Sequence, residues 1–190
     1  FVGRGWAGEL YGPGQPLDTT TFYIILPDQL GHGQSSKPSD GLHAKFPRYT
    51  YDDMVKLQYL MLTEGLGVNH LRLVMGTSMG GMQSWLWGEQ YPEFMDALMP
   101  LASVPGQISG RNRVWRRLII DAIRNDPTWM NGDYTTQPVS LRTAQQMIWL
   151  VGSNPYRRWQ SAQTLADADR VMEQAIASAV RGSDANDVLY

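Results

Sequence analysis

Short apolar runs occur three times in the first 105 residues of the chain, at Phe22 to Pro27, Leu71 to Met75 and Ala97 to Ala102. The first run is nearly continuous and rich in β-forming residues, as expected of a strand buried on both faces of a parallel sheet. The other two runs are also short enough to be strands. The pattern therefore predicts three strands.

Helical patterns separate these strands. After a long loop from Asp28 to Arg48, Thr50 and Asp53 form a variant of the N-terminal capping box, and apolar residues follow at helical spacing. A second helix is expected from Gly81 to Tyr91, where Pro92 stops it. Alternating strands and helices are typical of a parallel sheet with right-handed crossovers.

After Pro105 the alternation ends and only helical patterns remain. Three sets of apolar residues each share one helical face: Trp115, Leu118, Ile119 and Ala122; Leu141, Ala144, Ile148 and Val151; and Leu165, Ala168, Met172, Ala175 and Ala179. Helices inserted after a strand suggest a cap over an active site, with a separate helical domain as the alternative. We expect an α/β fold, with part of a parallel-sheet core over residues 1–105 and a helical cap over residues 106–190.

The junction of the second strand with its helix carries a catalytic signature. Gly76-Thr77-Ser78-Met79-Gly80 is a G-x-S-x-G sequence between an apolar strand and a helix, the arrangement of a nucleophile elbow. It predicts Ser78 as the nucleophile and the amide of Met79 as the first oxyanion-hole donor. We expect no room for side chains at Gly76 and Gly80, because strand and helix pack closely there. The alternative is a glycine-rich helix start with a capping serine.

No histidine that could take the proton of Ser78 follows this serine in the sequence. A serine hydroxyl needs a base within hydrogen-bond reach, and in the α/β-hydrolase order the acid and the histidine follow the serine. All three histidines of the chain precede Ser78. We therefore expect the acid and the histidine beyond Tyr190 and a second oxyanion donor before Phe1. The 190 residues alone are expected to be inactive.

Composition narrows the class of protein. A length of 190 residues suits one domain, and 43% hydrophobic residues argue against disorder. With a net charge of −2, the chain does not have the excess of basic residues that is typical of nucleic-acid-binding proteins. No apolar run reaches membrane-spanning length, no cysteine is present for disulfides or thiolate chemistry, and no histidine pair has metal-ligand spacing. We expect a small-molecule acyl substrate, with no metal, bound cofactor, nucleic acid or membrane.

Four segments together resemble a known family. They are Gly12-Pro13-Gly14 with Leu17-Asp18; Phe46-Pro47 with Thr50, Asp53-Met54-Val55 and Gln58; Gly76 to Gln83; and Arg124-Asn125-Asp126-Pro127 with Gly132-Asp133-Tyr134. The combination resembles the homoserine O-acetyltransferase-like branch of the α/β-hydrolase superfamily over almost the whole chain. The resemblance implies an α/β-hydrolase fold with a helical cap, a Ser-Asp-His triad with Ser78 as nucleophile, an acyl-serine intermediate and a substrate tunnel under the cap.

One loop departs from that branch. Acetyltransferases proper usually carry an N-x-x-G-G-C-x-G-S-T-G-P-like loop after the first strand, whereas Asp28 to Ser36 has the D-x-x-G-H-G-x-S form of general α/β-hydrolases. Thr77 also replaces the more usual glycine before the serine. We therefore expect hydrolysis of a small ester or thioester. The alternatives are acetyl transfer from acetyl-CoA, as co-substrate, to homoserine, and a catalytically inactive relative that acts as a binding protein.

The compartment depends on the acyl acceptor. A transferase that uses acetyl-CoA is expected in the cytoplasm, where acetyl-CoA occurs. A hydrolase with a signal peptide upstream of this chain would be expected in the periplasm. A homodimer is compatible with either a transferase or a hydrolase.

Arginines at the start of the cap are candidates for substrate binding. Arg111 and Arg113, with Arg116 and Arg117 beside them, could clamp a carboxylate or phosphate, because the guanidinium fork matches such groups. The alternative is a solvated helix face, on which Arg117 pairs with Asp121 four residues later.

Several other residues have weaker functional interpretations. His32 is expected to make structural hydrogen bonds in its loop, and His43 and His70 to lie in solvent. The acids Asp184 and Asp187 follow Ser78 but precede the later strands that would carry a triad acid. Packing in the core and cap, with one or two residues lining an acyl pocket as the alternative, is expected for the tryptophans Trp85, Trp87, Trp115, Trp129, Trp149 and Trp159.

Overall fold

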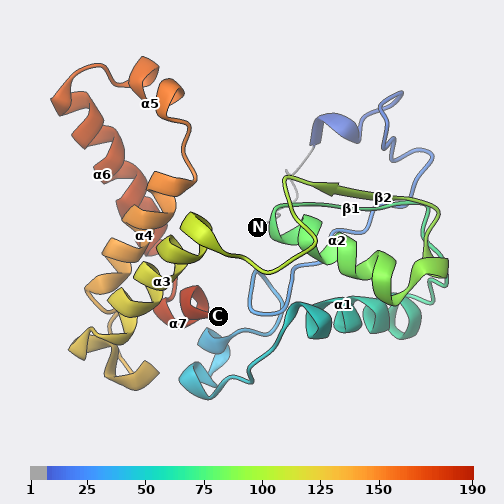
Figure 1. The fold of residues 1–190 in the computed structure, drawn as a ribbon, viewed down its shortest axis with the longest axis horizontal. Coiled ribbons are helices and arrows are strands. Elements are labelled where there is room, and N and C mark those ends of the chain that lie inside the picture. The colour runs from blue at the N-terminus through green and yellow to red at the C-terminus, as the bar shows by residue number, and fades with distance from the viewer. Residues whose placement is uncertain (1–7) are drawn as a thin grey trace. The chain divides into compact units, whose positions relative to one another are not determined.

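The computed structural model describes residues 8–190, which form two compact units (Figure 1). Residues 8–36 and 47–107 make up the core unit, and residues 37–46 and 108–190 make up the helical unit. The buried centre of the core unit contains Val55, Leu62, Trp87 and Met95. That of the helical unit contains Ile119, Ile123, Leu141, Ala144 and Ala185. Each unit therefore has a hydrophobic core of its own.

The core unit contains a two-stranded parallel sheet and two main helices. Strands β1 (Val74–Thr77) and β2 (Leu98–Leu101) pair with Val74 opposite Leu98 and Thr77 opposite Leu101. Helix α2 (Met79–Gln90) lies between this sheet and helix α1 (Tyr51–Leu60), as Figure 1 shows. A π-helical turn, Met61–Gly65, continues α1. The arrangement confirms the predicted parallel sheet, although β1 begins three residues later than the apolar run.

The capping pattern predicted for α1 is confirmed. The Thr50 backbone N–H donates to Asp53 Oδ2 over 2.7 Å, and the Asp53 N–H donates to Thr50 Oγ1 over 3.4 Å. These two bonds satisfy amide groups that the first helical turn leaves without partners. Helix α2 begins at Met79, two residues before the predicted start, because the elbow turn leads directly into it.

The predicted strand at Phe22 to Pro27 is wrong. Residues 22–27 form no strand, and residues 23–27 make no backbone hydrogen bond to another described residue. Phe22, Tyr23 and Leu26 are exposed. β-forming residues favour an extended chain, but a strand requires a neighbouring ladder to pair with. In the second strand of the sheet, β2, the side chains of Leu98, Met99 and Leu101 are exposed.

The helical unit contains five helices and three short 3₁₀ turns. The helices are α3 (Gly110–Arg124), α4 (Ser140–Val151), α5 (Pro155–Ser161), α6 (Leu165–Arg181) and α7 (Ala185–Leu189); the turns are Pro38–Asp40, His43–Lys45 and Pro127–Gly132. The three predicted faces correspond to α3, α4 and α6. The short helices α5 and α7 were not predicted, because neither is long enough for an apolar periodicity to emerge.

Residues 37–46 come from the predicted loop but pack with the helical unit. Ser39 donates through its backbone N–H (2.8 Å) and its hydroxyl (2.7 Å) to the two carboxylate oxygens of Asp187. The Tyr190 hydroxyl donates to the Phe46 carbonyl over 2.7 Å, and the two rings meet edge to face at 5.7 Å. These partners lie more than a hundred residues apart in sequence, so no local pattern predicts them.

Within residues 8–190, no helix combines the length and apolar character needed to cross a bilayer. The same residues contain no group of three or more histidine, aspartate or glutamate side chains placed to hold a metal ion.

Candidate active site

Ser78 occupies the turn between β1 and α2 in a strained backbone conformation. Its φ is 56° and its ψ is −114°, a region that residues with a Cβ rarely adopt. The Ser78 N–H donates to the Leu101 carbonyl at the end of β2 (2.9 Å), and its carbonyl accepts from the Met82 N–H (3.0 Å). The side chain is exposed and makes no capping hydrogen bond to α2. Ser78 therefore does not play the alternative role of a helix cap.

Close backbone packing around Ser78 depends on Gly76 and Gly81. A Cβ added to Gly76 would overlap the backbone carbonyl of Gly80. A Cβ added to Gly81 would lie 2.5 Å from Ser103 Oγ and 2.7 Å from the Leu101 carbonyl oxygen. Helix α2 can approach the strands this closely only because these positions lack side chains.

The expected steric restriction at Gly80 is wrong. A Cβ on Gly80 would have no neighbour within 4 Å outside its own helix. Gly80 contributes its backbone to the contact with Gly76, whereas the position that its own Cβ would take faces open space. Sequence alone could not separate these two roles, because both glycines occupy the same kind of position in the motif.

The first turn of α2 presents backbone donors next to Ser78. The first N–H groups of a helix have no partner within it, and no side chain caps α2 at Ser78. The N–H of Met79 is the first of these groups, and the helix dipole adds partial positive charge there. This geometry can stabilise negative charge that develops on a carbonyl oxygen held near Ser78.

The loop from Asp28 to Ser36 is closed by its own hydrogen bonds. The Ser35 hydroxyl donates to the Asp28 carbonyl (2.6 Å), and the Gln34 N–H donates to the Asp28 carboxylate (2.9 Å). His32 Nδ1 lies 3.3 Å from the Leu30 carbonyl oxygen, which confirms the structural hydrogen bonding expected of it.

His43 and His70 are partly exposed, as expected, but each has a carboxylate partner. His43 Nδ1 lies 3.4 Å from Asp133 Oδ1, and His70 Nε2 lies 2.9 Å from Asp96 Oδ1. Arg72 also binds Asp96 (2.8 Å), and its hydrogen bond, followed by that of His70, lowers the pKa of the Asp96 carboxyl. The partners lie 90 and 26 residues from their histidines in the chain, so sequence spacing did not indicate them.

The candidate substrate-binding arginines lie on α3. Arg111 and Arg113 are exposed. Neither side chain has a hydrogen bond or ion pair among residues 8–190, although the Arg113 backbone N–H donates to the Ser109 carbonyl within the helix start (3.2 Å). They belong to the helical unit, whereas Ser78 belongs to the core unit. Arg117 pairs with Asp121 at 2.7 Å, as predicted, and this bond lowers the pKa of the Asp121 carboxyl. The pairing supports a solvated face for Arg117.

Comparison with known protein families shows to which family this chain is related. The model of the alpha/beta hydrolase fold matches residues 5–144. The chain belongs to the α/β-hydrolase family. Its resemblance to homoserine acyltransferases is also confirmed: it is 38% identical over 141 residues to a homoserine O-acetyltransferase of Thermobifida fusca, covering 70% of this chain and 37% of that protein.

Two further similar proteins carry different activities in their names. A homoserine O-succinyltransferase of Burkholderia cenocepacia is 33% identical over 160 residues, covering 80% of this chain and 42% of that protein. The structure of the acetyl esterase MekB superposes with a TM-score of 0.79 at 27% identity, covering 95% of this chain and 55% of that chain. The chain thus spans 37% to 42% of the length of these curated relatives.

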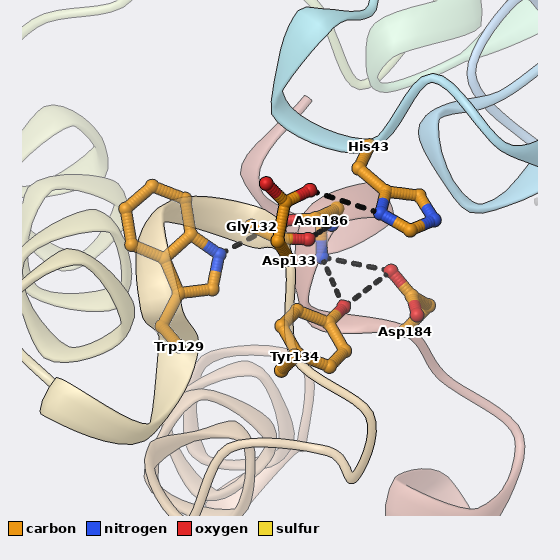
Figure 2. A network of polar contacts seen from close by, with 7 residues as sticks. All are labelled: His43, Trp129, Gly132, Asp133, Tyr134, Asp184 and Asn186. Atoms are coloured by element: carbon orange, nitrogen blue, oxygen red, sulfur yellow. Dashed lines mark hydrogen bonds and ion pairs between the residues drawn. The ribbon is translucent and has the colours of Figure 1, made fainter.

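In an α/β-hydrolase the triad acid follows the serine, but Asp184 and Asp187 have structural partners. Asp184 accepts from the Tyr134 hydroxyl (2.7 Å), from Gln137 Nε2 (2.8 Å) and from the Asn186 N–H (2.9 Å), as Figure 2 shows in part. Burial, followed by the bond to Asp184, raises the pKa of the Tyr134 hydroxyl. Asp184 therefore caps α7, and Asp187 holds Ser39.

Asn186 is a buried residue of this α/β-hydrolase chain that sequence reasoning missed. Its Oδ1 accepts from Trp129 Nε1 (2.8 Å), and its Nδ2 donates to the Gly132 carbonyl (2.9 Å), so it joins α7 to the Pro127–Gly132 turn (Figure 2). Gly132 has a φ of 97°, and a Cβ there would lie 2.6 Å from the Ala44 Cβ. The only sequence signal was the Gly132-Asp133-Tyr134 motif.

Packing was predicted for the tryptophans, and the structure confirms it for some of them. Trp87 is 3% exposed and belongs to the core, as predicted, and Trp115 and Trp129 pack against the core of the helical unit. Trp85 and Trp159 are 40% and 59% exposed, so the packing prediction fails for them.

Replacing Tyr134 by phenylalanine is expected to destabilise the helical unit by about 1–2 kcal/mol, because Asp184 loses a half-buried hydrogen-bond donor. Denaturant unfolding of the whole protein measures this effect. The matched control is Tyr156→Phe, since Tyr156 is 64% exposed and its hydroxyl has no partner among the described residues. Equal stability of the two variants would contradict a stabilising role for Tyr134.

Proposed function

We propose that the protein is a serine-nucleophile acyl-transfer enzyme that hydrolyses a small ester or thioester through an acyl-Ser78 intermediate. The observation that carries the proposal is the geometry of Ser78: an exposed, uncapped serine held at a φ of 56° where β1 meets α2. Backbone strain of about 1–3 kcal/mol persists where the surroundings enforce it, and such positions concentrate at active sites. Membership of the α/β-hydrolase family supports the same role.

The chemistry follows from the groups around Ser78. Ser78 Oγ attacks the carbonyl carbon of the substrate, and its proton passes to a base and then to the leaving alkoxide or thiolate. The Met79 N–H stabilises the oxyanion while the new O–C bond forms and the bond to the leaving group breaks. We place the base, its acid partner and the second oxyanion donor outside these 190 residues, as the greater length of the relatives supports.

Two molecules are candidates for the acceptor that takes the acyl group from Ser78: water and homoserine. The closed Asp28–Ser36 loop of hydrolase type and the likeness to an acetyl esterase favour water. The curated relatives named as homoserine acyltransferases favour homoserine. In that alternative we propose acetyl-CoA as the acyl donor. A small-molecule acyl compound is the partner in either case. Transfer from acetyl-CoA goes with a cytoplasmic location, and hydrolysis is compatible with the periplasm.

Decay of the acyl-enzyme distinguishes these acceptors. We expect the acyl-Ser78 form of the whole protein, made with an activated acetyl ester, to decay at the same rate with and without homoserine. A transferase must exclude water until its acceptor binds, whereas a hydrolase admits water. Acceleration by homoserine of about a hundredfold, worth about 2.7 kcal/mol of transition-state stabilisation, together with formation of acetylhomoserine, would assign the transferase reaction instead.

The same measurement tests the inactive alternative. A protein retained only for binding would form no acyl-enzyme at all with the ester. That result would overturn both enzymatic proposals.

A further inference from the structure

Two glutamines that close separate sequence motifs meet inside the core unit. Gln58 ends the motif of α1, and Gln83 ends the elbow motif in α2. Gln58 Nε2 donates to Gln83 Oε1 over 2.7 Å. Gln83 is 3% exposed, so its side-chain amide has no access to bulk water as an alternative partner. The bond is therefore a directional link between the two helices that is buried on the Gln83 side and half-buried on the Gln58 side.

Further bonds extend this link on both helices. Trp87 Nε1 donates to Gln58 Oε1 over 2.8 Å, and Gln83 Nε2 donates to Met54 Sδ over 3.4 Å. Gln83 and Trp87 lie one helical turn apart on α2, and Met54 and Gln58 lie one turn apart on α1. Each helix thus contributes two residues to three hydrogen bonds along the shared face. Buried amides with satisfied hydrogen bonds favour one arrangement, whereas an apolar pair tolerates several.

The opposite side of α2 packs directly on the sheet. Gly81 lies against the Leu101 carbonyl and Ser103, and Gly88, seven residues later, lies against the Leu98 side chain. Glycines allow this close approach, but a surface without side chains does little to prevent the helix from rotating about its axis. The hydrogen bonds of Gln83 on the α1 side restrict this rotation of α2.

Rotation of α2 matters because the helix starts directly after Ser78. The Met79 N–H is the first amide of α2, and the Ser78 carbonyl accepts from Met82 within the same turn. A rotated helix would therefore move the oxyanion donor and the serine together, relative to a carbonyl bound at the end of the strands. Misplacement of reacting groups by about 1 Å can cost about a hundredfold in rate.

We propose that Gln83, held by Gln58, is a positioning residue for Ser78 and the Met79 amide. The inference rests on the proposed function. Gln83 acts through the orientation of α2 and does not touch the substrate.

The test compares Gln83→Met, Gln58→Met and the double variant in the whole protein. Methionine has nearly the shape of glutamine but cannot form the amide hydrogen bonds. Single-turnover mixing with an activated acetyl ester gives the acylation rate constant and the half-saturating ester concentration, and thermal unfolding gives Tm. We expect each variant to lose about tenfold to a hundredfold in the acylation rate constant, with half-saturation changed less than twofold.

The double variant separates positioning from simple stability. Each single variant leaves the amide of the other glutamine without its partner and lowers Tm. The double variant removes both amides and regains part of the loss, although the Trp87 N–H still lacks the acceptor that Gln58 supplied. Acylation is expected to stay slow in the double variant, because the directional link is still absent. Acylation that recovers together with Tm would overturn the proposal.

Gln90→Met is the matched control. Gln90 also joins α2 to α1, through a 2.7 Å bond from Nε2 to Asp52 Oδ1, but it is at the other end of the helix and the bond is exposed. Its acylation rate constant should equal that of the wild type. Equal losses in Gln83→Met and Gln90→Met would overturn a specific role for Gln83. A wild-type protein that is not acylated at Ser78 would overturn the proposed function itself.

Discussion

Replacing Ser78 by alanine is expected to abolish the acyl-enzyme and to reduce ester turnover by on the order of 10⁴-fold or more. The Ser78 hydroxyl is the group that we propose as the nucleophile, and alanine removes it while keeping the backbone. Intact-protein mass spectrometry after mixing with an activated acetyl ester measures the intermediate as one added acetyl group per chain.

A neighbouring serine provides the control for that experiment. Ser84 lies on the same helix and donates to the Gly80 carbonyl over 2.9 Å, so Ser84→Ala removes a hydroxyl near the elbow without touching Ser78. This variant should acylate like the wild type. Acetylation that persists in Ser78→Ala would show that another residue is the nucleophile.

Replacing Gly76 by alanine is expected to cost about 3 kcal/mol of folding stability and to inactivate the enzyme with Ser78 intact. The added methyl group would overlap the backbone of Gly80, and neither β1 nor α2 can shift without breaking the contacts that hold the elbow. Denaturant unfolding and acylation of the whole protein measure the two effects.

Gly80→Ala is the matched control for Gly76→Ala. Its Cβ meets nothing within 4 Å outside the helix, and alanine is a better helix former than glycine. We expect Gly80→Ala to be neutral or slightly stabilising, by up to about 1 kcal/mol. Similar losses in both variants would show that the close approach of β1 and α2 is not the reason for the glycine at position 76.

Interactions between near neighbours in the chain were predictable. The capping bonds of Thr50 with Asp53 and of Thr164 with Asp167, and the pair of Arg117 with Asp121, depend on residues three or four positions apart. Helical geometry places such residues together whatever else the chain does. The elbow was predictable for a related reason, because one strand, one turn and one helix are contiguous.

Interactions between distant segments were not predictable. The apolar run from Phe22 to Pro27 has the composition of a strand, but pairing decides whether a strand forms, and a run carries no information about its partner. The meeting of Gln58 with Gln83 depends on how α1 packs against α2. The attachment of Ser39 to Asp187 likewise brings a loop to the helical unit from far along the chain.

The sequence by itself determined the longer helices, the caps of α1 and α6, the elbow and the family, because each of these depends on residues close together or on a motif. Only the tertiary structure decided which glycine of the elbow is sterically required. Gly76 and Gly80 are equivalent in the motif, yet only Gly76 directs the missing Cβ at another backbone. The way the helix crosses the strand sets the direction of each Cβ position. The space around a glycine therefore depends on which segment packs against it.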